Sequence, residues 1–502
     1  MARDALLTVD AGTSTIKAVA FDADGAELAT ARRETETRRP EQGHSEQDMA
    51  AVRDRTFDAL QELAGRLPAE TDPVGVGLTG QGDGLWTVTP GGDPAGNAIL
   101  WSDSRAAPLL EEWEADGTLD AIVEQCGSAP YPGMSLPLLV WLARNEPGRF
   151  DRIGTVLSCK DWLAHELTGA VSIDHSEATV PYLDSSTGRV DRGIFETVGL
   201  PRGQDLLPDL MVPTEVVGEV TPEAAGATGL DEGLPVISGP FDVPAAGIGS
   251  GTATPGGCSV TLGTSLTHQV LTDGPRAEAA GIGMALGIEG LWTYAVGSNA
   301  GTPSLEWAAD TVADVADVAD LEPLARRAPV GSDGVLYHPY LSTAGERGPF
   351  VDPDARAQFL GLGPDHDTEH LVRAVYEGLS LAVRDCVEHL PVDTQSVAAT
   401  GGGARSGLWC QLLADCLDRT VVVPTDSEPG AKGVAAVLGV ALGEYDSLAA
   451  GVDRTVSTDR RYTPRENAAA YDTLYELFVD VREEMATVWD RRAATYRELA
   501  DS

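Results

Sequence analysis

The 502-residue sequence contains very little lysine, because only Lys17, Lys160 and Lys432 occur and nearly all positive charge is arginine. It has 78 Asp and Glu residues against 35 Lys and Arg residues, which gives a formal net charge of −43. Binding to a nucleic-acid backbone needs a basic surface, so this composition argues against nucleic acid as a partner. The acids are spread along the chain, as on a folded surface whose self-repulsion is screened by concentrated salt. The sequence therefore predicts a salt-adapted protein.

The sequence also lacks long apolar runs and paired cysteines. No run approaches the ~20 apolar residues of a membrane span, and the start has no basic and apolar signal segment. We therefore expect a cytoplasmic protein without a membrane partner. The six cysteines form no C-x-x-C pair, which gives no support to a disulfide framework or a zinc ribbon.

The opening stretch LLTVDAGTSTIKAVAFD (6–22) has two β-favouring runs around an acid, a glycine and three hydroxyl residues. This pattern predicts a β-hairpin whose turn directs N–H groups and hydroxyls to one point, where phosphate oxygens bind. A carboxylate beside phosphate needs a cation between them, so we expect Asp10 to lie on the Mg²⁺ side. The residues expected on the phosphate side are Thr13, Ser14 and Lys17. An ordinary hairpin, in which Asp and Thr cap their own backbone, remains an alternative.

A second stretch, CSVTLGTSLTHQVL (258–271), repeats the arrangement of strand, Gly-Thr-Ser and strand. The sequence thus has two phosphate-type hairpins, one containing Thr13 and the other Thr264. Two copies in matched contexts predict two similar lobes that hold one polyphosphate from opposite sides.

The segment PVISGPFDVPAAGIGSG (235–251) is a short β-type run that ends in an acid and opens a small-residue helix. Asp242 at the carboxyl end of a strand is positioned to accept a proton from a substrate hydroxyl in a cleft between the lobes. Phosphoryl transfer requires such an acceptor, a metal ion and preorganised phosphate contacts. The alternative is that Asp242 is only the N-cap of the helix.

The segment VAATGGGARSGLWCQLLADCLDRTVVVP (397–424) places three glycines between a strand and a helix. It is not a dinucleotide fingerprint, because Ser406 stands where the last glycine is required, and no P-loop motif occurs in the chain. Glycines at such a junction let a flat ligand approach the backbone, which predicts a nucleotide platform. A tight strand-to-helix turn is the alternative.

Together these segments resemble the FGGY carbohydrate kinases, which have an actin-like ATPase fold. Similarity extends over almost the whole chain and includes GLTGQGDGLW, AILWSDSR, GPFDV, YHPYLSTAGERGPF and FLGLGPDHDTEHLVRAVYEGL. Two departures stand out. Leu138 replaces a lysine of the first family signature, and Gly82-Asp83 follows Gln81 where xylulose kinases commonly have Met-His. The G-Q-G-D-G version is closer to relatives that act on L-xylulose, erythritol or other polyols.

The resemblance implies an α/β fold with two ribonuclease H-like (actin-like ATPase) domains and a catalytic cleft between them. The N-terminal domain (1–245) is expected to bind the sugar and to carry the first phosphate motif. The C-terminal domain (246–502) is expected to bind the nucleotide. An amphipathic helix over 465–492 is expected to pack on its own domain.

The resemblance also assigns roles to individual residues. Asp242 is the catalytic base, and Asp10 and Asp242 are on the metal side. The residues that it assigns to ATP are Gly12, Thr13, Ser14, Lys17, Gly263, Thr264, Gly301, Gly402, Gly403 and Ala404. Those that it assigns to the substrate are Gln81, Asp83, Trp101 and Asp242. For Trp101, a core position on a strand is the alternative, and Arg105 is expected to hold a loop.

The expected activity is ATP- and Mg²⁺-dependent phosphorylation of a small sugar or polyol, with a ketopentose such as xylulose as the first candidate. Erythritol, glycerol and gluconate are alternative acceptors, and a homodimer is left open. A different class of function is an actin-like ATPase that uses nucleotide to switch conformation, although this gives no account of GQGDG or GPFDV. A catalytically silent sugar sensor is a third alternative.

Overall fold

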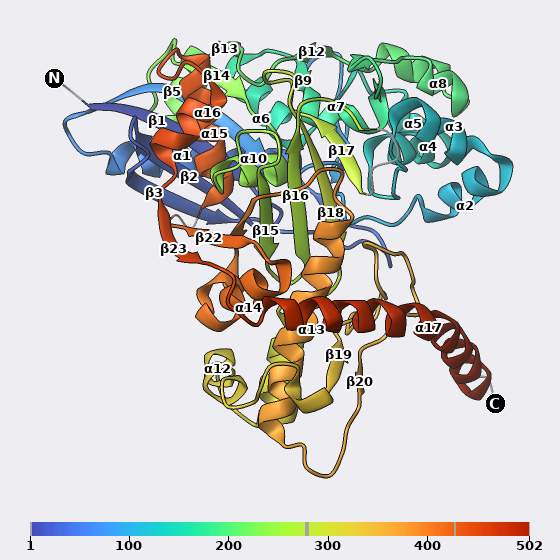
Figure 1. Cartoon of the computed structure of the whole chain (residues 1–502). Coiled ribbons are helices and arrows are strands. Elements are labelled where there is room, and N and C mark those ends of the chain that lie inside the picture. The colour runs from blue at the N-terminus through green and yellow to red at the C-terminus, as the bar shows by residue number, and fades with distance from the viewer. Residues whose placement is uncertain (1–2, 277–280, 426–427, 501–502) are drawn as a thin grey trace.

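The computed structural model describes residues 3–276, 281–425 and 428–500. Two mixed sheets organise the chain, one formed by the N-terminal half and the other by the C-terminal half (Figure 1). Each of the six cysteines is a free, buried thiol. Within the described ranges, no helix is long and apolar enough to cross a membrane.

The first sheet has six strands in the order β13-β14-β5-β1-β2-β3. Strands β1 and β2 form the predicted opening hairpin, while β5 and β14 run parallel to β1. The strands are β1 (Arg3–Ala11), β2 (Thr15–Asp22), β3 (Glu27–Glu34), β5 (Thr71–Gly80), β13 (Val216–Glu219) and β14 (Pro235–Ser238).

Helices cover both faces of the first sheet, which is why its central strands are almost continuously apolar. Leu7 and Val9 share a core with helices α1 (Met49–Arg66) and α6 (Cys159–Thr168). Their neighbour Leu6 points to the opposite face. The alternation follows from the two-residue period of a strand.

The second sheet has seven strands in the order β17-β18-β16-β15-β21-β22-β23. Its hairpin β15–β16 is antiparallel, and β21 and β22 run parallel to β15. The arrangement therefore repeats that of the first sheet, as the paired Gly-Thr-Ser motifs predict. The strands are β15 (Cys258–Leu262), β16 (Leu266–Thr272), β17 (Ile282–Ala285), β18 (Trp292–Ser298), β21 (Ser396–Thr400), β22 (Thr420–Pro424) and β23 (Thr458–Tyr462).

Two helices join the lobes. Helix α15 (Pro429–Ala441) belongs to the C-terminal half in sequence, but it packs on strands β1 and β5 of the first sheet and on α10 (Asp242–Gly249). The two helices approach so closely that a Cβ atom on Gly433 would overlap the carbonyl oxygen of Ala245. A Cβ atom on Gly249 would likewise overlap the carbonyl oxygen of Pro429. Glycine is therefore required where the helices cross.

The C-terminal helix α17 (Ala468–Ala500) packs with its first half against α13 (Thr368–Glu388) and α14 (Gly407–Leu417). This agrees with the predicted amphipathic helix. Trp489, further along the helix, is also buried, against Tyr340 and Phe350. Beyond Trp489 the end of α17 extends away from the rest of the chain (Figure 1).

Shorter elements complete both halves. In the N-terminal half they are β4 (Glu46–Gln47), β6 (Trp86–Val88), β7 (Ala98–Ile99), α2 (Ala107–Asp116), α3 (Thr118–Cys126), α4 (Ser135–Asn145), α5 (Pro147–Phe150), β8 (Thr155–Leu157), β9 (Ser172–Asp174), α7 (His175–Tyr182), β10 (Leu183–Asp184), β11 (Arg189–Val190), α8 (Ile194–Thr197), η1 (Pro201–Asp205), β12 (Asp209–Met211) and α9 (Pro222–Thr228). In the C-terminal half they are α11 (Pro303–Trp307), η2 (Ala308–Ala313), η3 (Val318–Asp320), α12 (Leu321–Ala325), η4 (Ser332–Gly334), β19 (Leu336–His338), β20 (Gln358–Leu360), η5 (Gly402–Arg405) and α16 (Leu448–Thr455).

Candidate active site

The turn of the first hairpin is bound to residues that sequence reasoning placed on the sugar side. The Thr13 hydroxyl donates a hydrogen bond to Gln81 Oε1 at 2.9 Å, and Trp101 Nε1 donates to the Thr13 hydroxyl at 3.0 Å. Because both partners come from distant segments, the alternative in which Thr13 caps its own backbone is wrong. The first phosphate motif and the sugar motif thus form one surface.

Gln47 closes this polar network and was not identified from the sequence. Its Nε2 donates to the carbonyl oxygen of Thr13 at 2.8 Å, and its Oε1 accepts from Gln81 Nε2 at 2.8 Å. Gln47 and Gln81 are both buried. The hydrogen bond between the two amides, together with the bond that each makes to Thr13, holds the Thr13 turn in place.

Asp242 is the first residue of α10, directly after strand β14 and a short turn. Phe241, not Asp242, occupies the N-cap position. The Asp242 carboxylate nevertheless accepts hydrogen bonds from the N–H groups of Val243 and Gly82, so it does satisfy one N–H group at the helix start. Burial, followed by repulsion from Asp10 and Asp83, raises the pKa of Asp242 to about 7. A carboxylate with a pKa near neutrality is suited to proton transfer.

Asp10 is the penultimate residue of strand β1, opposite Lys17 on β2. Burial raises the pKa of Asp10 to about 6, although Lys17 opposes the shift. Helix α15 begins beside it, because a Cβ atom on Gly430 would lie 3.0 Å from Asp10 Oδ2. Asp10 therefore faces the first turn of a helix that comes from the other half of the chain.

Lys17, which the sequence predicts as a phosphate contact, is paired with a carboxylate in the structure. Its ammonium lies 2.6 Å from Glu428 Oε2, while Arg32 lies 2.6 Å from the other oxygen of Glu428. Sequence reasoning missed Glu428, which precedes α15 and is nearly 400 residues from its partners.

Asp83 lies in the loop after β5, with a left-handed backbone angle φ of +58°. Burial raises the pKa of Asp83 to about 6. The Tyr131 hydroxyl donates to Asp83 Oδ2 at 2.8 Å, and the Asp83 N–H donates to Glu177 Oε2 at 3.1 Å. Tyr131 and Glu177 are further residues that sequence reasoning missed, because neither stands in a recognisable motif.

Trp101 is 41% exposed, so the alternative of a core position is wrong. Its side chain covers the Thr13 turn through the indole hydrogen bond and leaves part of the ring open to solvent. Arg105 pairs with Asp103 and Glu46 at 2.8 Å each. It therefore holds a loop, as predicted.

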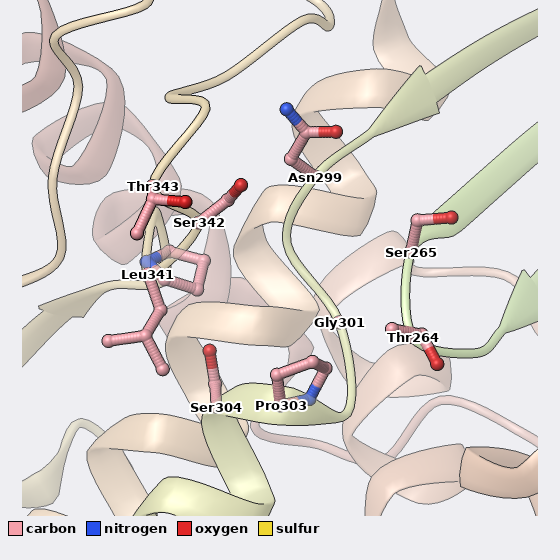
Figure 2. A pocket seen from close by; sticks show the side chains of 10 residues that line it. Thr264, Ser265, Asn299, Gly301, Pro303, Ser304, Leu341, Ser342 and Thr343 are labelled. Carbon is pink, nitrogen blue, oxygen red and sulfur yellow. The ribbon is translucent and has the colours of Figure 1, made fainter. Parts of the chain in front are cut away.

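The second hairpin borders a pocket of about 380 Å³ (Figure 2). Thr264 and Ser265 lie on one side of it, while Ser342 and Thr343 lie across from them. Gly301 packs directly on the hairpin, because a Cβ atom there would overlap the carbonyl oxygens of Gly263 and Thr264. The remaining lining residues are Asn299, Pro303, Ser304, Pro339 and Leu341.

The triple-glycine loop has two different kinds of glycine. Gly401 has a φ of +84° and packs against Leu262, and Gly403 packs against the ring of Trp409. These contacts fit the alternative of a tight turn for both residues. Gly402 is exposed with open space around its Cα, whereas Ala404 is buried. Of this loop, Gly402 is the residue whose backbone a ligand can approach.

The described residues contain no group of three or more His, Cys, Asp or Glu side chains arranged to hold a metal ion. Mg²⁺ commonly binds to one or two carboxylates, with phosphate oxygens and water as its other ligands. Asp10, half-buried beside the turn of the first hairpin, fits that requirement. Asp242 lies close enough to Asp10 for the charge of Asp10 to raise its pKa.

Comparison with known proteins places this arrangement in a family. Residues 5–249 match the model of the N-terminal domain of the FGGY family of carbohydrate kinases, and residues 258–442 match the model of its C-terminal domain. The chain belongs to the FGGY family of carbohydrate kinases.

The chain is similar to an erythritol kinase of Brucella abortus, with 33% identity over 98% of both chains. It is also similar to a xylulose kinase of Bacillus subtilis, with 26% identity over 95% of this chain and 96% of the relative. A crystal structure of a xylulose kinase from Rhodospirillum rubrum matches with a TM-score of 0.88 and 27% identity. That match covers 97% of this chain and all of the other.

Family membership confirms the predicted two-domain actin-like fold and the predicted class of activity. This FGGY kinase is an ATP-dependent carbohydrate kinase that transfers a phosphoryl group to an alcohol. The alternative of an actin-like ATPase that only switches conformation is not supported. Leu138, which departs from the family signature, is a buried core residue of α4, so the departure lies outside the site.

Proposed function

We propose that this kinase phosphorylates a small, neutral polyol or ketose, with Asp242 as the general base. The observation that carries the proposal is the convergence of Asp10, Asp83 and Asp242, each half-buried and each with a raised pKa. Three acids that lie close together and are not already held in an ion pair can bind a substrate hydroxyl and a metal-bound phosphate. Asp242 accepts the proton of the attacking hydroxyl as the new P–O bond forms.

The charge of the acceptor site favours a neutral substrate. Asp83 and Glu177 are acids near Asp242, and the buried cation Lys160 is paired with Asp161 and Asp174. A sugar acid such as gluconate would bring a further carboxylate into this group and be repelled. Carboxylates accept hydrogen bonds from hydroxyl groups on neighbouring carbon atoms, and a polyol provides such groups.

Among neutral acceptors, we place erythritol ahead of xylulose and glycerol. The support is the 33% identity to an erythritol kinase, compared with 26% to the xylulose kinase of Bacillus subtilis. The G-Q-G-D-G motif, with Asp83 in place of the usual histidine, is consistent with this order. Xylulose, the first candidate from the sequence, becomes the second.

For the nucleotide side, we propose that ATP binds in the pocket beside Thr264 and reaches the Thr13 turn with its γ-phosphate. Gly12, Ser14, Gly263 and Gly402 would contribute backbone groups, and Gly403 and Ala404 would lie beneath the base. Mg²⁺ would be held by Asp10, with Asp242 nearby, and would neutralise charge on the phosphates. Lys17 would contact the transferred phosphate after leaving Glu428.

Several broader features are part of the same proposal. The domain boundary lies near residue 245, so that 1–245 binds the sugar and 246–502 the nucleotide. The protein works in a salt-rich cytoplasm, as its charge suggests.

The test is a screen of ADP release with ketopentoses, erythritol, glycerol and gluconate, in molar KCl with Mg²⁺. We expect erythritol or a ketopentose to give the highest kcat/KM.

Asp242→Asn should keep ATP binding and lose turnover by about two to four orders of magnitude, which is the usual contribution of a positioned base. Turnover within a few fold of the wild type would reject Asp242 as the base.

A further inference from the structure

Glu177 stands in the first turn of α7, and that turn is fixed by a buried ion pair. The carboxylate of Asp174 accepts hydrogen bonds from the N–H groups of Ser176 at 2.8 Å and Glu177 at 3.3 Å. Lys160 lies 2.6 Å from Asp174, and both side chains are fully buried. The position of Glu177 is therefore set by groups that cannot relax into solvent.

The same turn joins the two parts of the acceptor site. Glu177 Oε2 accepts a hydrogen bond from the N–H of Asp83 at 3.1 Å. The hydroxyl of the adjacent Ser176 accepts one from the N–H of Phe241 at 3.1 Å. Phe241 immediately precedes Asp242, so residues 176 and 177 contact the loop of Asp83 and the start of the catalytic helix together.

The second oxygen of Glu177 lacks a partner. Glu177 is 7% exposed, and Oε1 has no hydrogen-bond partner among residues 3–276, 281–425 and 428–500. Buried polar atoms are normally satisfied, and an unsatisfied one costs about 1–3 kcal/mol. An atom left in this state beside a substrate site needs a donor from outside the chain.

The neighbours of Glu177 show which donor would fit. Tyr131 donates its hydroxyl to Asp83, and burial, followed by the charges of Asp83, Glu177 and Asp242, raises the pKa of Tyr131. Burial, reinforced by Asp83 and Asp174, raises the pKa of Glu177 well above its usual value. Acceptor oxygens outnumber donors in this group, so a ligand rich in hydroxyl groups is the complement.

We propose that Glu177 is a specificity-determining residue, whose Oε1 accepts a hydrogen bond from the acceptor hydroxyl next to the one held by Asp83. The inference rests on the proposed function. It adds the requirement that the substrate carry neighbouring hydroxyl groups. It also explains why the turn contains a buried acid with two oxygens, although the contact with the Asp83 loop uses only one of them.

A purely structural role is the competing account. If Glu177 only anchored the Asp83 loop through Oε2, its loss would weaken every acceptor by the same factor. If Oε1 binds a hydroxyl, its loss should weaken only acceptors that carry this hydroxyl. The ratio of kcat/KM between an acceptor and its deoxy analogue separates the two accounts.

The experiment measures ADP release by full-length wild type, Glu177→Met and Glu177→Gln. Each acceptor is paired with an analogue that lacks one of two neighbouring hydroxyls: erythritol with 1,2,4-butanetriol, and xylulose with its 4-deoxy analogue. We expect the wild type to prefer the complete acceptor of at least one pair by roughly 5- to 10-fold, as for a hydrogen bond between neutral groups. In Glu177→Met that preference should fall below about 3-fold.

Glu177→Gln keeps the side-chain volume and an oxygen for the Asp83 N–H, and it turns the second atom into a donor. Like Glu177→Met, it should lower the preference for the complete acceptor. It can therefore replace Glu177→Met in the test if that variant does not fold. Glu223→Gln, an exposed acid on α9, is the charge-matched control and should leave the preference unchanged. ADP binding measured by calorimetry should be equal in all four proteins.

The outcomes distinguish this inference from the function on which it rests. An unchanged preference in both Glu177 variants, with an active wild type, would overturn the role of Glu177 and leave the proposed function standing. A wild type that phosphorylates none of the acceptors would overturn both.

Discussion

At the level of single residues, the site is dominated by carboxylates that burial keeps from ionising easily. Asp242 has a pKa of about 7, with Asp10 and Asp83 at about 6. Such values carry a cost in stability, since the ionised form is disfavoured in the folded chain. Groups of this kind gather at catalytic sites because proton transfer near neutral pH needs them.

The first residue-scale prediction concerns the pH dependence of the reaction. Below pH 7 Asp242 is protonated in the free enzyme and cannot accept the substrate proton. We expect kcat/KM to fall about tenfold per pH unit on the acid side, with an apparent pKa near 7. Initial rates between pH 5 and 9 at fixed KCl would check this. A flat profile down to pH 5 would contradict it.

The raised pKa of Asp242 also affects the thermal stability of the protein in the absence of Mg²⁺ and nucleotide. An aspartate has a pKa of about 3.9 in an unfolded chain. Because the folded value is raised, the fold loses stability as the pH rises from about 4 to 7. Asp242→Asn avoids that loss, so its Tm should exceed that of the wild type by roughly 2–5 °C at pH 8. The gain should shrink toward pH 5, and a gain that is independent of pH would rule out this cause.

Residues that we propose for the chemistry could be picked out of the sequence where they stand in short motifs. Asp10, Thr13, Gln81, Asp83 and Trp101 come from three segments of the sequence, and Thr13 brings two of them into direct contact. Glu177, Tyr131, Gln47 and Glu428 were not predictable. Each takes its role from a partner more than 30 residues away, and no local pattern reports such a contact.

At the level of elements, both hairpins could be predicted because apolar runs flank a Gly-Thr-Ser turn. The glycine loop was predicted only in part, since close packing of Gly401 and Gly403 depends on Leu262 and Trp409. The crossing of α10 and α15 was not predicted. Its glycines lie nearly 200 residues apart, and each is explained only by the backbone of the other helix.

This crossing gives an element-scale prediction. Gly433→Ala and Gly249→Ala should each lower the free energy of unfolding by at least about 1–3 kcal/mol, because the added methyl group meets backbone that cannot move aside. Both should also reduce turnover, since α10 begins with Asp242. Thermal unfolding and ADP release would measure the two effects.

Gly226→Ala is the matched control for that prediction. Gly226 lies in helix α9, and a Cβ atom added there would meet open space. Alanine there should be neutral or should stabilise by up to about 1 kcal/mol through helix propensity. Equal effects at positions 226, 249 and 433 would show that the crossing is not tight.

At the level of the whole molecule, the charge of −43 is the feature that no single contact explains. Salt shortens the Debye length from ~8 Å at physiological ionic strength to ~3 Å at 1 M, which weakens repulsion between acids on the surface. We therefore expect the Tm to rise by several degrees between 0.1 M and 2 M KCl. A Tm that is highest at low salt would contradict salt adaptation.

Two lobes of like topology were predictable from the repeated motif, whereas the way that they are joined was not. Helix α15 is made late in synthesis, yet it covers one face of the sheet that begins at residue 3. While the ribosome is still producing the middle of the chain, strands β1 and β5 have no cover on that face. The N-terminal lobe must therefore wait for almost the whole polypeptide before it can finish folding, and the nascent chain needs protection from aggregation in the meantime.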